Sequence, residues 1–182
     1  MKQETKLIQQ CLAGNRQAQF QLYGQFKAKM FGLCYRYAKN RAEAQDMLQD
    51  GFVKVFQKLH TYRAVKPLGA WIHRIMVNTA LEHIRKRKMV FDDFATVESP
   101  AYNARYQAQD DIMGRMEAKA LIQLLRQLPV EHQTILNLYA IEGYSHKEIG
   151  EMLHISVSNS KVRLMRARKA FKIILEKNLI HK

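Results

Sequence analysis

The sequence predicts an all-α fold, built as two helical domains joined by a flexible linker. Apolar residues recur at three- and four-residue spacing through most of the 182-residue chain, which is the period of amphipathic helices. Only three prolines and eight glycines interrupt this pattern. Residues 91–112 lose the periodicity and are acidic. We therefore expect one helical domain over residues 1–90, a linker over residues 91–112, and a second helical domain over residues 113–182.

The formal charge of +14 is spread unevenly along the chain. Residues 1–90 carry a net charge of +12 (17 Lys and Arg against 5 Asp and Glu), residues 91–112 carry −4 (1 against 5), and residues 113–182 carry +6 (12 against 6). Two basic blocks joined by an acidic segment indicate two modules that both meet a polyanion. Charge alone does not separate nucleic acid from an anionic membrane surface.

In the first domain, helices are expected over residues 3–13, 16–38, 41–59 and 68–87, with a loop over residues 60–67. Each helix carries a broad apolar face, as in a helical bundle. The aromatic residues of the second helix favour a packed core over a ligand site. The expected core includes Leu7, Cys11, Phe20, Tyr23, Met30, Leu33, Cys34, Met47, Phe52, Val55, Ile72 and Met76.

The helix over residues 41–59 has the one acidic face in this basic block. Its outer side carries Glu43, Asp46, Gln49, Asp50 and Lys54. One interpretation is an ordinary solvated face. The other is a docking surface for a basic protein partner, because carboxylates are poorly suited to contact phosphates.

Aromatic and cationic residues occupy the loop HTYRAVKP and the helix that follows it. The loop holds Tyr62, Arg63 and Lys66, and the helix adds Trp71 and Arg74. Aromatic rings stack on unpaired bases, and cations follow the sugar–phosphate backbone. The pattern favours contact with single-stranded nucleic acid, although a lone tryptophan is more often part of a core.

In the second domain, helices are expected over residues 113–127 and 131–141, separated by Pro129. A helix-turn-helix is expected at about residues 145–168. Ser145 and Glu148 have the spacing of a capping box before the first of its helices, and Ser156 can cap the second.

Charge is segregated on the second helix of this motif. Ser160, Leu164, Ala167 and Phe171 fall on one side, whereas the other sides carry Ser158, Asn159, Lys161, Arg163, Arg166, Arg168 and Lys169. Such a helix fits a DNA major groove, with its N-terminal residues nearest the base edges. A helical hairpin with a solvated basic face is the alternative.

No catalytic or metal-binding constellation stands out, so we expect no enzymatic activity, no cofactor, no metal and no small-molecule substrate. Cys11 and Cys34 lie in apolar helical patterns and are expected to be reduced core residues. No segment has the apolar length of a transmembrane helix, and the N-terminal residues lack the apolar core of a signal peptide. A cytoplasmic protein is therefore expected.

Three stretches together resemble a known family. EAQDMLQDGFVKVFQKL (residues 43–59), AWIHRIMVNTALEHIRKRK (70–88) and GYSHKEIGEMLHISVSNSKVRLMRARKAF (143–171) occur in this order. The layout resembles the extracytoplasmic-function group of bacterial RNA polymerase sigma factors, in the sigma-70 family, over nearly the whole chain. The first stretch is similar to the segment that binds the polymerase core, the second to the helix used on the promoter −10 element, and the third to the helix-turn-helix that reads the −35 element.

The resemblance implies that the protein binds core RNA polymerase, recognises both promoter elements and helps to melt the promoter. Residues 1–90 would be sigma region 2 and residues 113–182 sigma region 4. The implied partners are core RNA polymerase, through the clamp helices of its largest subunit and through the polymerase flap, promoter DNA and an anti-sigma factor. The acidic linker would lie in the channel toward the RNA exit path. The implied site residues are Asp46, Gln49, Asp50, Phe52 and Lys54 for core polymerase; Tyr62, Arg63, Lys66, Trp71, Arg74 and Asn78 for the −10 element; and Ser158, Asn159, Lys161, Arg163, Arg166 and Lys169 for the −35 element.

Two positions depart from the family pattern. His154 stands in the turn where glycine is frequent, and Ser158 and Asn159 stand where many members have Gly-Thr, so no −35 base preference is carried over. Two other functions remain open from the residues alone: a self-contained, dimeric helix-turn-helix regulator, and an enzyme with a DNA-binding tail. A sigma factor should bind core polymerase one to one, whereas the regulator should dimerise on a palindromic duplex.

Overall fold

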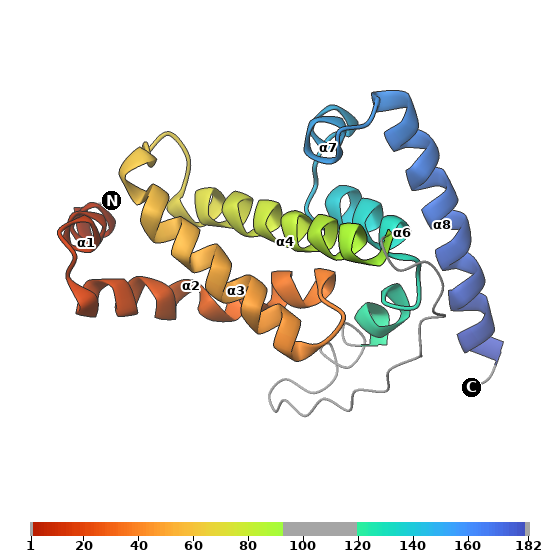
Figure 1. The fold of residues 1–182 in the computed structure, drawn as a ribbon, viewed down its shortest axis with the longest axis horizontal. Helices are drawn as coiled ribbons and strands as arrows, with labels where there is room; N and C mark the ends of the chain where they lie inside the picture. The colour runs from red at the N-terminus through yellow and green to blue at the C-terminus, as the bar shows by residue number, and fades with distance from the viewer. Residues whose placement is uncertain (1, 93–119, 181–182) are drawn as a thin grey trace. The chain divides into compact units, whose positions relative to one another are not determined.

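The computed structural model of the chain describes residues 2–92 and 120–180, and every regular element within them is helical. These residues form two compact units, which confirms the predicted all-α fold with two helical domains (Figure 1). Most of the expected linker, residues 93–112, and the beginning of the helix expected over residues 113–127 lie outside the described residues.

The first unit contains the helices α1 (Lys2–Leu12), α2 (Arg16–Tyr37), α3 (Arg41–Lys58) and α4 (Leu68–Asp92), with the 3-10 turn η1 (Leu59–Thr61) after α3. Helices α2, α3 and α4 pack against one another, and α1 packs on α2 and η1 (Figure 1). The side chains at their centre are apolar and almost fully buried: Leu22, Met30, Leu33, Cys34, Met47, Val55, Ile72 and Met76.

Local hydrogen bonds explain where two of these helices begin. The Asn15 side-chain oxygen accepts a hydrogen bond from the Ala18 amide (3.1 Å), and the Asn40 side-chain oxygen accepts one from the Glu43 amide (2.8 Å). Each asparagine thereby satisfies an amide that has no partner within its helix. The boundaries at α2 and α3 are therefore set by short polar residues and need no distant contact.

Helices α3 and α4 approach each other closely at Gly51. A Cβ atom built at Gly51 would overlap the sulfur of Met76. Glycine at this position gives room to the end of the Met76 side chain, where the two helices that carry most of the predicted site residues meet.

Several expectations for the first unit differ from the structure. Tyr23, expected in the core, is only half-buried. Phe20 is 75% exposed, not part of the core. The buried stripe of α2 passes through Ala18 and Leu22, and a residue two positions from each lies on the opposite side of a helix. In addition, α4 continues to Asp92 and does not end near Arg87, because the residues after Arg87 include no proline or glycine that would stop the helix.

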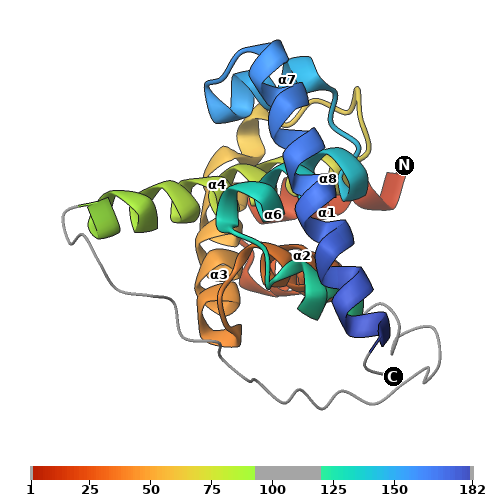
Figure 2. The same cartoon turned by 90° about the vertical axis from the view of Figure 1, so that its right-hand side faces the viewer.

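The second unit consists of a helical segment over residues 120–125, followed by α6 (Val130–Leu136), the π-helical turn η2 (Asn137–Ile141), α7 (His146–Leu153) and α8 (Val157–Ile180). Helix α8 packs against α6 and α7, and Figure 2 shows α7 beside the first turns of α8. Ile135, Leu138, Ile149, Leu164 and Ala167 form the buried centre.

The helix expected over residues 131–141 is not uniform. After Leu136 the chain widens into the π-helical turn, where the Glu142 amide donates to the Asn137 carbonyl at 2.9 Å. Gly143 then adopts a positive φ of 75°, and the helix ends there as expected. Tyr139, expected to be buried, is only half-buried and lies at the edge of the core.

Candidate nucleic-acid and protein interfaces

The first helix of the predicted helix-turn-helix begins with a complete capping box. The Glu148 amide donates to the Ser145 hydroxyl at 3.3 Å, and the Ser145 amide donates to the Glu148 carboxylate at 2.9 Å. The pattern S-x-x-E therefore gave the correct start of α7.

The turn between α7 and α8 depends on two backbone positions. His154 adopts the left-handed conformation, with φ 55° and ψ 46°, which residues with a Cβ atom seldom adopt. A Cβ atom at Gly150 would lie 2.7 Å from the Ile155 carbonyl oxygen, so the chain passes too close for any side chain there. Ser156 then caps α8 by accepting a hydrogen bond from the Asn159 amide at 3.1 Å.

Helix α8 has one buried and one exposed side. Ser160, Leu164 and Ala167 are buried, as predicted, whereas Phe171 is half-buried. Of the residues predicted to contact the −35 element, Ser158, Asn159, Lys161, Arg166 and Lys169 are exposed. Arg163 is half-buried, and its Nε donates to the Asn159 side-chain oxygen at 3.2 Å. The structure thus exposes five of the six residues on one helix, with Arg163 at the border of the exposed side.

A stack of side chains holds this helix in place, and sequence reasoning missed it. The rings of Tyr139 and His146 are stacked with centroids 4.7 Å apart, and the Arg168 guanidinium lies 5.5 Å from the Tyr139 ring centroid. The His146 ring is also held by Ser160 of α8, because its Nδ1 lies 2.9 Å from the Ser160 hydroxyl oxygen. Arg168, predicted as one of the outward cations, therefore helps to join η2, α7 and α8.

The loop before α4 is closed by an aromatic pair. The rings of Tyr62 and Trp71 lie with centroids 5.5 Å apart at an interplanar angle of 59°, and the Tyr62 hydroxyl donates to the Lys66 carbonyl at 2.8 Å. Burial, followed by the nearby Glu4 carboxylate, raises the pKa of Tyr62, so the phenol stays protonated and remains a donor at neutral pH.

The other predicted −10 residues are accessible. Arg63 and Lys66 are exposed in the loop, and Arg74 and Asn78 are exposed on α4. Trp71, Arg74 and Asn78 follow one another at three- and four-residue spacing, so they share one side of α4. The Tyr62–Trp71 contact brings the cationic loop to that same side. One continuous surface therefore offers aromatic rings together with cations.

Only some side chains of the predicted docking face on α3 are exposed to solvent. Asp46, Gln49 and Asp50 are exposed, but Asp50 also contacts His83 on α4, with 2.8 Å between its Oδ2 and His83 Nε2. Lys54 forms an ion pair with Glu82. Phe52 is only 3% exposed and packs edge-on against Tyr23, with ring centroids 4.6 Å apart. Phe52 thus packs in the core beneath the docking face and is not available for direct contact with a partner.

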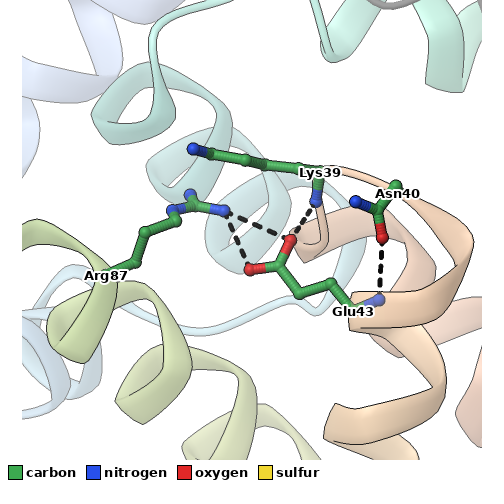
Figure 3. Close-up of polar contacts among 4 residues, drawn as sticks. All are labelled: Lys39, Asn40, Glu43 and Arg87. Atoms are coloured by element: carbon green, nitrogen blue, oxygen red, sulfur yellow. Dashed lines mark hydrogen bonds and ion pairs between the residues drawn. The ribbon is translucent and has the colours of Figure 1, made fainter.

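Glu43 is turned toward its own domain. Its carboxylate accepts hydrogen bonds from Arg87 Nη1 at 3.1 and 3.4 Å and from the Lys39 amide, and its backbone amide donates to Asn40 (Figure 3). The acidic residues that remain at the surface of the face are therefore Asp46 and Asp50. The three pairs between α3 and α4 could not be found from spacing, because their members lie 28, 33 and 44 residues apart.

Within residues 2–92 and 120–180, no group of three or more His, Cys, Asp or Glu residues is arranged to hold a metal ion. In the same residues, no helix combines the length and the apolar character needed to cross a membrane.

Each of the two units matches a known protein family. Residues 22–89 match the family model of sigma-70 region 2, and residues 118–171 match that of sigma-70 region 4. The first match contains the α3 face, the loop and most of α4. The second contains the helix-turn-helix.

Whole-length relatives give the same result. The chain is 30% identical over 177 residues to the RNA polymerase sigma-H factor of Pseudomonas aeruginosa, covering 93% of this chain and 92% of that protein. It is 27% identical over 175 residues to the ECF RNA polymerase sigma factor SigW of Bacillus subtilis, covering 92% and 94%.

Solved structures share the fold. The chain resembles the sigma factor RpoE in its complex with the anti-sigma factor NepR from Bartonella quintana, with a TM-score of 0.57, 20% identity and coverage of 86% of this chain and 95% of that one. It also resembles CnrH in its complex with the cytosolic domain of CnrY, with a TM-score of 0.53, 23% identity and coverage of 94% and 96%.

Two helical units, one with an aromatic and cationic surface and one with a helix-turn-helix, together with these relatives, define a sigma factor that acts in promoter-directed transcription initiation. The chain belongs to the sigma-70 family, in its extracytoplasmic-function group.

Proposed function

We propose that the two units contact separate parts of a promoter while the exposed side of α3 binds core RNA polymerase. The observation that carries this proposal is the division of surfaces: α8 exposes five of its six predicted DNA contacts, and the Tyr62–Trp71 surface lies in the other unit. A single duplex-binding helix-turn-helix does not need a second, aromatic and cationic surface of this kind.

Helix α8 serves as the reader of the −35 element. Its first turn is capped by Ser156, which leaves Ser158 and Asn159 at the end of the helix that approaches base edges in helix-turn-helix proteins. Arg166 and Lys169 lie farther along the exposed side and suit phosphate contacts. The hydrogen bond from Arg163 to Asn159 supports a polar base contact, because it limits the rotation of the Asn159 amide.

The Tyr62–Trp71 surface serves the unwound −10 strand. Stacking of a base on an aromatic side chain contributes about 1–3 kcal/mol, and extrusion of a base costs a few kcal/mol. Stacking on this surface, with Arg63, Lys66 and Arg74 available for the backbone, can therefore offset local melting without ATP.

The exposed side of α3 serves as the contact with the clamp helices of the largest polymerase subunit. Asp46 and Gln49 are exposed there, and Asp50 reaches the surface even while it contacts His83. In a chain with a formal charge of +14, an exposed acidic patch suits a basic protein surface better than it suits DNA.

Charge reversal tests this docking face. Asp46→Arg is the cleaner variant, because Asp50→Arg also breaks the contact with His83. Both variants should abolish co-elution with core polymerase in gel filtration, whereas Glu4→Arg, with the same change of charge at an exposed position of α1, should co-elute normally. Normal assembly of both α3 variants would rule out the assigned face.

Transcription in vitro tests the function as a whole. Purified protein added to core polymerase should direct initiation from specific start sites and should bind the core one to one. A self-contained regulator would instead form dimers on a palindromic duplex and leave start-site selection unchanged, so the same two measurements separate the alternatives.

An anti-sigma factor is the proposed inhibitory partner, and the cytoplasm is the proposed compartment. The support is analogy: RpoE and CnrH were each solved with an anti-sigma factor or a cytosolic partner domain, and they share this fold. Affinity purification of the full chain from its native cells should recover one protein that blocks binding to core polymerase. Recovery of core subunits alone would count against such a partner.

A further inference from the structure

The exposed side of α8 is not uniformly polar. Val162 is 38% exposed and Met165 is 63% exposed, and both lie among the residues proposed to read the −35 element. Single apolar side chains on a protein surface are ordinary. Whether Val162 and Met165 take part in recognition therefore depends on their position on the helix.

Helix geometry places Val162 at the centre of the exposed side. Successive residues of an α-helix are rotated by about 100°, so Val162 points almost directly away from the buried side formed by Ser160, Leu164 and Ala167. Met165 lies one turn farther along the helix and is rotated by about 60° from Val162, toward Lys161. Lys161 lies on one flank of the exposed side.

The opposite flank carries Arg166, so cations border the apolar centre on both sides. In a helix that enters a major groove, flanking cations meet the phosphates of the two strands, and the centre faces the base edges on the groove floor. Val162 is one turn after Ser158 and Asn159, in the N-terminal part of the helix where base contacts concentrate.

The major groove offers an apolar side chain one characteristic partner. Every base edge there presents hydrogen-bond donors or acceptors, and thymine alone among the four bases adds a methyl group at C5. We infer that Val162 contacts the C5-methyl group of a thymine in the −35 element, so that this base pair is chosen by apolar contact and not by a hydrogen bond. The inference rests on the proposed role of α8.

The chemical test removes only the methyl group. Holoenzyme assembled from the full chain and core polymerase is used to select its −35 element from a pool randomised upstream of the −10 element. Each thymine of the selected element is then replaced by deoxyuridine, which keeps the Watson–Crick edge and lacks the methyl. Loss of one buried methyl group should weaken binding about fourfold at a single position.

Variants connect that position to Val162. In holoenzyme made with Val162→Ala, the same deoxyuridine replacement should have little further effect, which is the signature of a direct interaction in a double-mutant cycle. Ile173→Ala is the matched control, since Ile173 is an exposed apolar residue of α8 that lies about 16 Å farther along the helix axis. It should leave the fourfold penalty unchanged.

Three results would overturn the inference while the proposed function stands. The first is a selected −35 element that contains no thymine, and the second is that no replacement by deoxyuridine weakens binding. The third is that the fourfold penalty persists in Val162→Ala. In the last two cases the apolar centre of α8 serves another purpose, such as contact with a protein. If the holoenzyme selects no upstream element at all, the proposed −35 role of α8 fails as well, so the two failures are distinguishable.

Discussion

Arg87 near the end of α4 and Glu43 at the start of α3 form an ion pair, with Nη1 and Oε1 3.1 Å apart and both side chains mostly buried. The pair joins the two helices that carry the proposed core-binding face and the proposed −10 surface. It lies in the first turn of α3, where a carboxylate also benefits from the positive end of the helix dipole.

Replacement of Arg87 by methionine should therefore destabilise the first unit. The Glu43 carboxylate would lose a charged donor but keep the Lys39 amide, so the free energy of unfolding should fall by about 1.5–3 kcal/mol. Urea unfolding followed by the fluorescence of Trp71 measures this change, because Trp71 is the single tryptophan of the chain and lies in this unit. Lys86→Met, at the exposed neighbouring position, should change stability by less than about 0.5 kcal/mol. Equal effects of the two variants would mean that the ion pair contributes nothing.

The Cys34 thiol should be unreactive in the folded protein. The side chain is fully buried, and this burial raises the pKa of Cys34 from 9.0 to about 12, against smaller opposing effects of Arg36 and the backbone. At pH 8 the thiolate fraction, and with it the rate of alkylation, should be roughly a thousandfold lower than in the unfolded chain. Iodoacetamide labelling of a Cys11→Ser variant isolates this thiol, and labelling at the unfolded rate would contradict its burial.

The same shift gives a pH dependence of stability with a defined sign. Because the folded-state pKa is raised, the folded protein binds the thiol proton more tightly, and this contribution is present in full below pH 9. It should be lost as the pH rises from about 9 to about 12. The difference in unfolding free energy between the parent chain and Cys34→Ala, followed over that range, isolates this contribution from the titration of lysines and tyrosines. A difference that does not fall would show that Cys34 is not held protonated.

His154 provides a test of backbone strain in the turn. At its φ of 55°, a residue with a Cβ atom is less stable than glycine by about 1–2 kcal/mol. Glycine offsets part of this difference, because it loses more conformational entropy on folding. His154→Gly should thus stabilise α7 and α8 by up to about 1 kcal/mol, whereas His154→Val should destabilise them, since β-branched residues avoid this conformation. Hydrogen exchange of the α7 and α8 amides reports both changes. The same protection in both variants would show that the turn stores no strain.

Sequence reasoning succeeded where the cause is local. The capping residues Ser145 and Ser156 interact with amides three residues away, so their effect is visible within one turn of sequence. The burial of Leu164 and Ala167 follows from the 3.6-residue period in the same way. Such features define the helix-turn-helix before any tertiary contact is known.

The failures concern interactions between segments. Phe20 is apolar but lies on the side of α2 that no other described helix covers, and composition alone does not show this. Likewise, the Tyr139–His146 stack involves a residue of the π-helical turn, for which the sequence offers no periodic signal. On α3, Asp46, Gln49 and Asp50 were correctly placed outside, whereas Glu43 and Lys54 are half-buried and paired with α4, which the sequence could not show.

Trp71→Ala should impair promoter opening more than duplex binding. Loss of a stacking ring removes about 1–3 kcal/mol of stabilisation from the melted state, which corresponds to roughly a 5-fold to 150-fold loss of open complex. Permanganate reactivity of unpaired thymines measures opening, and retention of the closed complex measures duplex binding. Trp71→Phe, which keeps an aromatic ring beside Tyr62, should retain most of the opening. If both variants weaken closed and open complexes equally, Trp71 only supports the fold.

Arg166→Ala should reduce the salt dependence of −35 binding. Arg166 is exposed on α8, and each phosphate contact of a cation contributes about 0.9 to the slope of log K against log salt concentration. Holoenzyme carrying this variant should therefore bind more weakly at low salt, with a slope shallower by about one, and it should lose affinity for all duplex sequences alike. Lys177→Ala is the control, since it removes an exposed cation from the last turns of the same helix, about 16 Å beyond Arg166. An unchanged slope in Arg166→Ala, or an equal change in Lys177→Ala, would remove Arg166 from the DNA-contacting surface.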